Sequence, residues 1–298
     1  MDVSIIIVNY NTKELLRNCL QSIYDKTKDI SFEVIVSDNN SSDGSVEMII
    51  NDFKNVILIK NTENLGFGAA NNRALSIAKG KYVFYLNSDT VLLNNAVKMF
   101  YDYWESSNDS IKIGALGANL LNKDKEIIHS YGQFDTFKSV CILYFKIHLS
   151  IIKRLIFHKQ NYKKNIKNPF FEGDVDFITG ADLFVLNNSF AYFDENYFLY
   201  SEDCDLQWQM KNANLIRRII KGPQIIHLEG ASTKELKDPL APYKKGSRIM
   251  QGISRIRFIK KNQSKLLANL LKIKLTLIWL HPCLIKYTSR YFRKMWSV

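Results

Sequence analysis

Residues 82–89 read YVFYLNSD, a short apolar run that ends in three polar residues. Five consecutive apolar side chains are typical of a parallel strand that is buried on both faces. In an open α/β sheet, ligands bind at the carboxyl ends of such strands. The stretch therefore predicts a central strand over 82–86, with Asn87, Ser88 and Asp89 at the ligand-binding edge of the sheet.

The same pattern of an apolar run and a polar ending recurs upstream. Further strands are predicted over residues 3–8, 32–37 and 56–60, and amphipathic helices over 13–24, 46–53 and 69–79. Thr12 is placed to cap the first of these helices. The alternation of strand and helix predicts an α/β fold with a mostly parallel, doubly wound sheet flanked by helices.

Beyond residue 110 the pattern changes. Strands are predicted over 112–121, 176–186, 216–220 and 224–227, with a helix from Asp203. We expect this second half to build the other wall of the ligand site. The predicted divisions are a domain over 1–235, split at 110 and carrying an insert at 136–171, and a helical tail over 236–298.

Asp89 and Asp38 each end a predicted strand and are candidate ligand-binding residues. A carboxylate at this edge can hold Mg²⁺ or Mn²⁺ against substrate phosphates, which suits Asp89. The alternative is that Asp89 or Thr90 caps a following helix. Asp38 can accept hydrogen bonds from a nucleobase or a ribose, or it can form an Asx turn with its own backbone.

Three further segments contain residues that are candidates for binding or catalysis. The loop at 64–73, NLGFGAANNR, contains glycines before a helix and can turn backbone N–H groups toward phosphate, although it lacks the Walker A pattern. Residues 202–205 hold three carboxylates, which suit either a general base or a solvated helix start. His227 is either a metal ligand or an ordinary partnered histidine.

The net charge of +12 is unevenly distributed. Residues 136–171 contain eight Lys/Arg and residues 239–298 contain fourteen, and neither stretch contains an acid. Together they carry +22, which leaves −10 for the remainder. Because both stretches are also rich in apolar residues, we expect them to bind an anionic membrane surface and not nucleic acid.

Two segments have the pattern of interfacial helices. Over 140–157 one apolar face is predicted, formed by Ile142, Phe145, Leu149, Ile152 and Ile156, although this helix can alternatively pack on the protein's own core. Residues 266–285 are apolar but contain Lys272 and Lys274, which disfavour a membrane span. We expect this segment to lie in the membrane interface, with Trp279 and Trp296 as anchors.

The cysteines and the N-terminus bear on the cellular compartment. The four cysteines form no C-x-x-C pair, which favours reduced thiols. Residues 3–8 begin a strand and follow no basic region, so we expect no signal peptide. The expected location is the cytoplasm, peripheral on the inner face of the cell membrane.

The order of these motifs resembles family 2 inverting glycosyltransferases, and the rhamnosyltransferase-like branch in particular. The resemblance covers about residues 2–235. It is carried by the following segments: 4–11 (SIIIVNYN), 38–45 (DNNSSDGS), 64–72, 86–90 (LNSDT), 180–186, 200–206 (YSEDCDL) and 226–232. It implies a GT-A fold with a basic helical C-terminal extension, a nucleotide-sugar half over 1–110 and an acceptor half over 111–235.

The resemblance also implies roles for individual residues. Those expected to bind the nucleotide sugar are Val8, Asn9, Tyr10, Asp38, Asn40, Gly66, Asn71, Asn72 and Asn87. Asp89 and His227 would bind Mg²⁺ or Mn²⁺, Asp203 would be the general base, and Glu202 would bind the acceptor. A glycan or lipid-linked acceptor of bacterial surface polysaccharide synthesis is implied.

Two departures from the family pattern leave alternatives open. Asn87 replaces the first of two metal-motif aspartates, and residues 207–210 (QWQM) lack an arginine that relatives often carry. A catalytically inactive membrane scaffold with this fold is therefore one alternative. A nucleotidyltransferase is the other, although no basic, glycine-rich loop follows the first strand.

Overall fold

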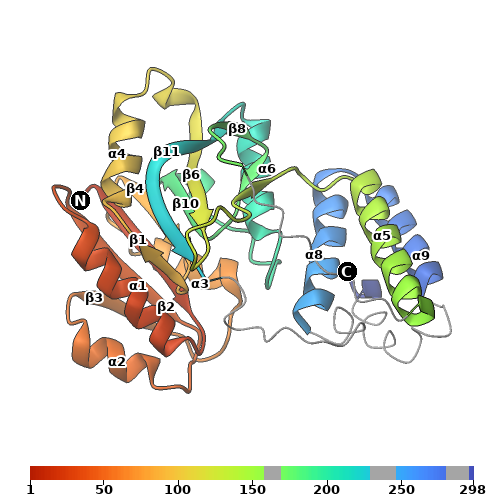
Figure 1. Cartoon of the computed structure of the whole chain (residues 1–298), viewed down its shortest axis with the longest axis horizontal. Helices are drawn as coiled ribbons and strands as arrows, with labels where there is room; N and C mark the ends of the chain where they lie inside the picture. The colour runs from red at the N-terminus through yellow and green to blue at the C-terminus, as the bar shows by residue number, and fades with distance from the viewer. Residues whose placement is uncertain (158–168, 229–245, 280–294) are drawn as a thin grey trace. The chain divides into compact units, whose positions relative to one another are not determined.

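A computed structural model of the chain describes residues 1–157, 169–228, 246–279 and 295–298 (Figure 1). The chain forms two compact units. Unit 1 comprises 1–133, 167–198 and 202–234, and unit 2 comprises 134–166, 199–201 and 235–298. Residues 158–168 of the predicted insert, residues 229–232 of the predicted acceptor motif, and residues 236–245 and 280–294 of the predicted tail lie outside the described residues.

Unit 1 is built on a nine-stranded sheet. Its strands, in spatial order, are β3 (Val56–Lys60), β2 (Phe32–Asp38), β1 (Val3–Asn9), β4 (Tyr82–Leu86), β10 (Asp182–Leu186), β6 (Ile113–Leu121), β11 (Ile216–His227) and β5 (Thr90–Leu92), and β8 (Gly173–Val175) pairs with β11. β3, β2, β1 and β4 are parallel. The predicted α/β sheet is therefore confirmed, with antiparallel strands in its second half.

The register of the parallel strands aligns their carboxyl ends. Asn9 at the end of β1 pairs with Asp38 at the end of β2, and Ile6 pairs with Tyr85 of β4. Parallel strands that share a register also share an edge, so the polar residues after these strands emerge together.

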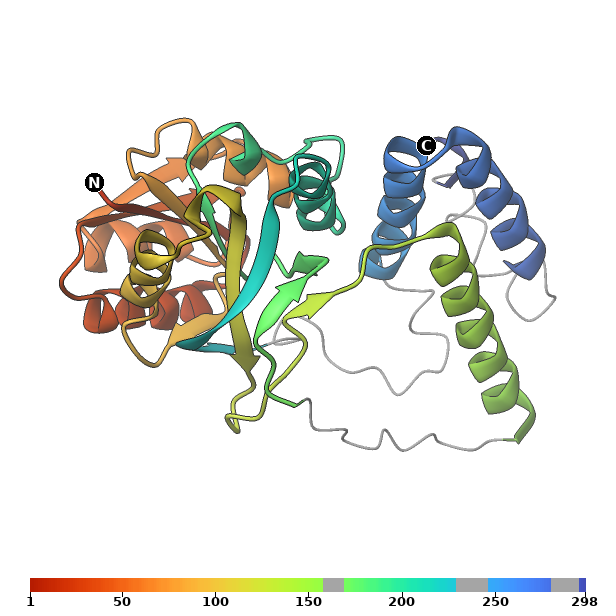
Figure 2. The same cartoon turned by 90° about the horizontal axis from the view of Figure 1, so that it is seen from above.

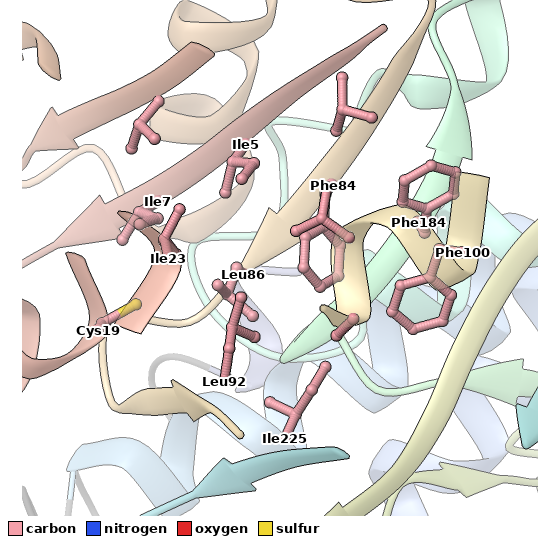
Figure 3. Close-up of a cluster of buried hydrophobic side chains, with 14 of the residues drawn as sticks. Ile5, Ile7, Cys19, Ile23, Phe84, Leu86, Leu92, Phe100, Phe184 and Ile225 are labelled. Carbon is pink, nitrogen blue, oxygen red and sulfur yellow. The ribbon is translucent and has the colours of Figure 1, made fainter. Parts of the chain in front are cut away.

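Two apolar layers cover the faces of the sheet because successive side chains of a strand alternate between its faces. Ile5 and Ile7 belong to the layer with α1 (Lys13–Lys26), α2 (Ser45–Asp52) and α4 (Ala96–Ser106). Ile6 belongs to the layer with α3 (Phe67–Leu75) and α6 (Glu202–Asn212). Figure 3 shows the first layer, where Phe84, Phe100 and Phe184 pack ring to ring.

Several predicted boundaries in the second half are wrong. Lys112 ends a 3₁₀ turn, η1 (Ser110–Lys112), before β6 begins. The strand predicted over 176–186 is interrupted: β9 (Phe177–Ile178) pairs with β7 (Tyr131–Gly132), and β10 follows separately. The two strands predicted at 216–220 and 224–227 are one strand, β11, whose pairing with β6 shifts register between Ile220 and Ile225.

Two helix predictions also need correction. Thr12 precedes α1, but its side chain makes no capping hydrogen bond. It bonds to residues of other segments instead, as described below. The helix predicted over 69–79 is α3, which begins at Phe67 and ends at Leu75, so both of its ends lie earlier than the apolar pattern indicates.

Unit 2 contains the helices α5 (Phe137–Phe157), α8 (Gly246–Asn262) and α9 (Lys265–Trp279), and α9 contacts both α5 and α8 (Figure 2). Arg255 of α8 forms an ion pair with Asp135 (3.0 Å). The basic insert and the basic tail thus share one packed unit. No helix in the described part of the chain is long and apolar enough to span a bilayer.

Candidate active site

A chain of hydrogen bonds joins the carboxyl ends of β1, β2 and β4. Asn9 Nδ2 donates to Asp38 Oδ2 (2.7 Å) and to Ser41 Oγ (3.0 Å). Thr12 Oγ1 donates to Asn9 Oδ1 (2.6 Å) and lies 2.9 Å from Ser88 Oγ. The end of β2 is therefore connected through two side chains to the NSD segment that follows β4.

Asp38 is buried at the centre of this network. Its Oδ1 accepts a hydrogen bond from Ser41 N (2.8 Å), so the local turn considered from the sequence is present. Because each carboxylate oxygen has two lone pairs, these contacts leave acceptor capacity for a ligand. Tyr10 and Asn40 are exposed beside the network, and Val8 is partly buried.

The loop that precedes α3 is held by an asparagine that sequence reasoning did not single out. Asn39 Nδ2 donates to Asn64 Oδ1 (3.2 Å) and to Gly66 O (3.0 Å), while its Oδ1 accepts from Asn61 Nδ2 (3.0 Å). The backbone at Gly66 has φ 84°, and a Cβ there would lie 2.1 Å from Phe198 O. Only glycine fits this position, because any side chain would collide with the backbone of Phe198.

Asn71 and Asn72 are buried in α3, and their side chains bond to the protein itself. Asn71 Nδ2 donates to Phe67 O (3.0 Å). Asn72 exchanges hydrogen bonds with the backbone of Phe193 (2.9 Å in each direction) and donates to Glu195 (3.0 Å). These contacts hold the Asn71 side chain along its own helix and attach the Asn72 side chain to the segment at Phe193 and Glu195.

Asp89 and His227 come together at the same edge. β5 pairs antiparallel with β11, which sets His227 opposite Thr90. As a result His227 Nε2 lies 3.2 Å from Asp89 Oδ1 and 3.4 Å from Asn87 Nδ2. A β-strand, not a helix, begins at Thr90, so the alternative role of Asp89 or Thr90 as a helix cap is wrong.

The Asp89–His227 pair fits a divalent cation. Two ligands about 2.1 Å from an ion at adjacent octahedral positions lie about 3 Å apart, close to the separation found here. Carboxylate oxygen and imidazole nitrogen both suit Mn²⁺. No third His, Cys, Asp or Glu joins them among the described residues, so the remaining ligands would come from a substrate or from water.

Glu202 and Asp203 begin α6, where Glu202 is buried and Asp203 is partly buried. Asp203 Oδ2 accepts from Gly180 N (2.9 Å) and its Oδ1 from Cys204 N (2.8 Å). Glu202 is 5% exposed, and its Oε2 accepts no hydrogen bond from the described residues. The alternative of a solvated acidic helix start is therefore wrong for Glu202.

Burial governs the protonation of these two carboxyl groups. Desolvation, followed by repulsion from Asp203, raises the pKa of Glu202 well above its usual value. Desolvation also raises the pKa of Asp203, while its backbone hydrogen bonds oppose that shift. The hydrogen bonds that both oxygens of Asp203 accept from backbone N–H groups favour its charged form, whereas the burial of Glu202 favours its protonated form.

The α6 carboxylates reach the same sheet edge as Asp89. Asn87 N donates to Ala181 O (3.1 Å), and the neighbouring Gly180 is held by Asp203. Gln207, which occupies the segment that lacks the expected arginine, exchanges hydrogen bonds with the Ile178 backbone (2.7 and 2.8 Å) and so fixes α6 to β9. These contacts connect the three acidic positions, 38, 89 and 203, within unit 1.

Comparison with known proteins assigns this arrangement to a family. The profile of Glycosyl transferase family 2 matches residues 4–171, and the chain belongs to that family. The described fold is similar to that of a mannosyltransferase from Pyrobaculum calidifontis solved with GDP-Man and Mn²⁺, with a TM-score of 0.54 and 14% identity over 99% of this chain and 73% of that one. It is also similar to Staphylococcus aureus TarS, with a TM-score of 0.53 and 15% identity over 93% of this chain and 43% of that one. The predicted GT-A fold is confirmed.

Sequence relatives with named activities match over part of the chain. A poly(ribitol-phosphate) beta-glucosyltransferase of Bacillus spizizenii is 34% identical over 39% of this chain and 19% of its own length. A UDP-Glc:alpha-D-GlcNAc-diphosphoundecaprenol beta-1,3-glucosyltransferase of Escherichia coli is 36% identical over 37% of this chain and 39% of its own. In both cases the match spans less than two thirds of the relative.

Replacement of Thr12 by valine is expected to break the hydrogen-bond chain between Asn9 and Ser88. The change preserves side-chain shape but removes the hydroxyl, which leaves partly buried polar atoms without a partner. We expect a loss of about 1–3 kcal/mol in the free energy of unfolding, measured by urea titration. Thr12→Ser keeps the hydroxyl and should lose much less, and equal losses in the two variants would contradict the assignment.

Substitution of Glu202 by glutamine is expected to change how stability depends on pH. A carboxyl group whose pKa is higher in the folded state than in the unfolded state destabilises the folded protein as pH increases. This loss begins near the pKa of glutamate in the unfolded chain, about 4.3. Glu202→Gln should therefore gain stability relative to the wild type between pH 5 and pH 8 in urea titrations. The exposed Glu47→Gln is the control, and parallel pH profiles for all three proteins would contradict the buried, proton-retaining role.

Proposed function

We propose that this protein is an inverting glycosyltransferase that moves a sugar from a nucleotide diphosphate to an acceptor hydroxyl. This proposal is supported by the hydrogen bonds and the ion pair that join the segments carrying Asp38, Asp89 and Asp203 along one edge of the sheet. Such a transfer requires one carboxylate that binds the nucleoside, one that binds the cation, and one that takes the proton from the acceptor.

The donor is assigned to the edge formed by β1, β2 and β4, and residues 1–110 are its half of the catalytic domain. Asp38, with the backbone of Val8 to Tyr10, would bind the nucleoside, and the exposed Asn40 lies beside it. The loop fixed by Asn39 around Gly66 presents backbone groups next to this position. Because Asn71 and Asn72 bond to the protein, we assign them to support of the loop and not to direct donor contact.

Asp89 and His227 would hold Mg²⁺ or Mn²⁺ together with the donor diphosphate. When bound, the cation supplies electrostatic stabilisation of the leaving diphosphate. Asn87 contributes an amide where relatives contribute a carboxylate, so it adds no charge to this position. The separation of 3.2 Å between Asp89 Oδ1 and His227 Nε2 supports this assignment.

Asp203 is proposed as the general base for the acceptor hydroxyl. The acceptor oxygen bonds to the anomeric carbon as the bond to the diphosphate breaks on the opposite face, and the hydroxyl proton moves to Asp203. A single displacement of this kind inverts the anomeric configuration. Glu202, whose pKa is raised well above its usual value by burial, keeps its own proton and can donate a hydrogen bond to the acceptor.

The acceptor is proposed to be a glycan or a lipid-linked glycan of a bacterial surface polysaccharide. The Escherichia coli relative is named for an undecaprenol-linked acceptor, and the relative from Bacillus spizizenii for a polymer of ribitol phosphate. We assign the chain to the rhamnosyltransferase-like branch on the motifs SIIIVNYN and LNSDT. A lipid-linked acceptor places the reaction at a membrane, consistent with the basic stretches of unit 2.

Replacement of Asp203 by asparagine tests the catalytic assignment. Loss of the base is expected to lower the transfer rate by roughly 10²–10⁴-fold and to leave nucleoside diphosphate binding largely unchanged, because the base acts on the acceptor. The rate is measured with a panel of nucleotide sugars, after thermal-shift screening selects the donor. The exposed Asp124→Asn serves as the matched control, and a near-normal rate for Asp203→Asn would remove this residue from the role.

The cation assignment predicts opposite effects of two neighbouring substitutions. Asn87→Asp adds a carboxylate and should lower the Mn²⁺ concentration that gives half-maximal donor hydrolysis, whereas Asp89→Asn should raise it by about tenfold or more. Activity should be lost with a chelator and restored by Mn²⁺. Full activity in the presence of the chelator would contradict metal dependence. The role of Asp203 would be unaffected by that result, because the Asp203→Asn variant tests it separately.

A further inference from the structure

Helix α9 has an apolar face that the protein does not bury. Leu266, Leu270, Ile273 and Leu277 are spaced by four, three and four residues, which places them on one side of the helix, and they are 45–67% exposed. The opposite side carries Ala268, Leu271 and Leu275, which are buried. Helix α9 is thus apolar on two faces, and within the described part of unit 2 only one of them is buried.

Helix α5, which contacts α9, repeats this arrangement. Val140, Cys141 and Tyr144 are buried, so the predicted alternative that this helix packs on the protein's own core holds for that side. Ile142, Phe145 and Leu149, the apolar face expected from the sequence, are 39–54% exposed. The side chains of Ile152, Ile156 and Trp279 lie outside the described part of the structure.

Charged and aromatic side chains flank the exposed face of α9. Lys265 and Lys274 are exposed on either side of the apolar stripe. Trp296 is half exposed, donates from Nε1 to Thr276 Oγ1 (3.3 Å), and has the Lys272 ammonium 5.6 Å from its ring centre. Tryptophan and lysine at the margin of an apolar helix face are typical of helices that lie in a membrane interface.

The positive charge of unit 2 favours an anionic membrane as its partner over a second copy of the chain. Residues 136–166 and 239–298, which belong to unit 2, contain twenty-one Lys/Arg and no acid. A second copy of the chain would bring two such surfaces together, and like charges would oppose that contact. An anionic lipid surface offers both the opposite charge and an apolar layer.

We propose that the exposed faces of α9 and α5 bind an anionic membrane, with α9 lying in the plane of the interface. Leu266, Leu270, Ile273 and Leu277 enter the acyl boundary, and Lys265 and Lys274 meet the lipid phosphates. Among the described residues no helix is long and apolar enough to cross a bilayer, and Lys272 and Lys274 within α9 disfavour a transmembrane position. This inference deepens the membrane association proposed above and names the residues that produce it.

Vesicle sedimentation of the full chain tests the proposal. Wild-type protein should bind vesicles of phosphatidylglycerol and phosphatidylcholine, bind pure phosphatidylcholine weakly, and dissociate as salt increases. The double variant Leu270→Ser/Ile273→Ser should lose at least about tenfold in affinity for the anionic vesicles. The matched control is Ile50→Ser/Ile77→Ser, which removes two exposed isoleucines from unit 1 and should bind like the wild type.

Three results would overturn the proposal: no binding of the wild type to anionic vesicles, equal binding by both double variants, or a stable dimer in solution that Leu270→Ser/Ile273→Ser alone dissociates. The vesicles contain no sugar donor, so their result is independent of glycosyl transfer. Nucleoside diphosphate binding, measured on the same variants, separates a failure of membrane docking from a failure of the donor site.

Discussion

The parallel register of β1 with β2 and β4 is the constraint on which the site depends. It places Asn9 directly beside Asp38 and brings the segment after β4 to the same edge, so that Thr12 can bridge Asn9 and Ser88. A shift of one residue would turn each of these side chains to the other face of the sheet. Polar pairs near both ends of β1 hold the register with β2, because Ser4 donates to Glu33 and Asn9 donates to Asp38.

The two halves of unit 1 contribute different chemistry to this edge. The first half supplies neutral amides and hydroxyls around Asp38, which bind polar groups without adding charge. The second half supplies Asp203 and Glu202 in a desolvated position, where burial and mutual repulsion separate their protonation states. His227 reaches Asp89 only because β11 continues past its irregular pairing with β6 to meet β5.

Unit 2 differs from unit 1 in that some of its helices expose apolar faces. Its buried core holds α5, α8 and α9 together, while the outer faces of α5 and α9 keep apolar side chains exposed among cations. Soluble surfaces seldom gather apolar groups in this way unless they have a partner. Residues 136–166 of the first basic stretch and the whole of the second, far apart in the sequence, belong to the same unit.

The sequence by itself determined the parallel sheet, the positions of the acids at the strand ends, and the family. It could do so because the apolar runs of β1, β2 and β4 and the polar residues that end them are local features of the chain. Only the tertiary structure decided that Asn39 holds the Gly66 loop, that Asn72 supports Phe193, that β11 is a single strand, and which of two apolar faces of α5 is buried. These features depend on partners distant in the chain, such as Phe198 for Gly66 and Asp89 for His227. Propensity and spacing carry no information about such contacts, since each amide or histidine has many possible partners and only packing selects one.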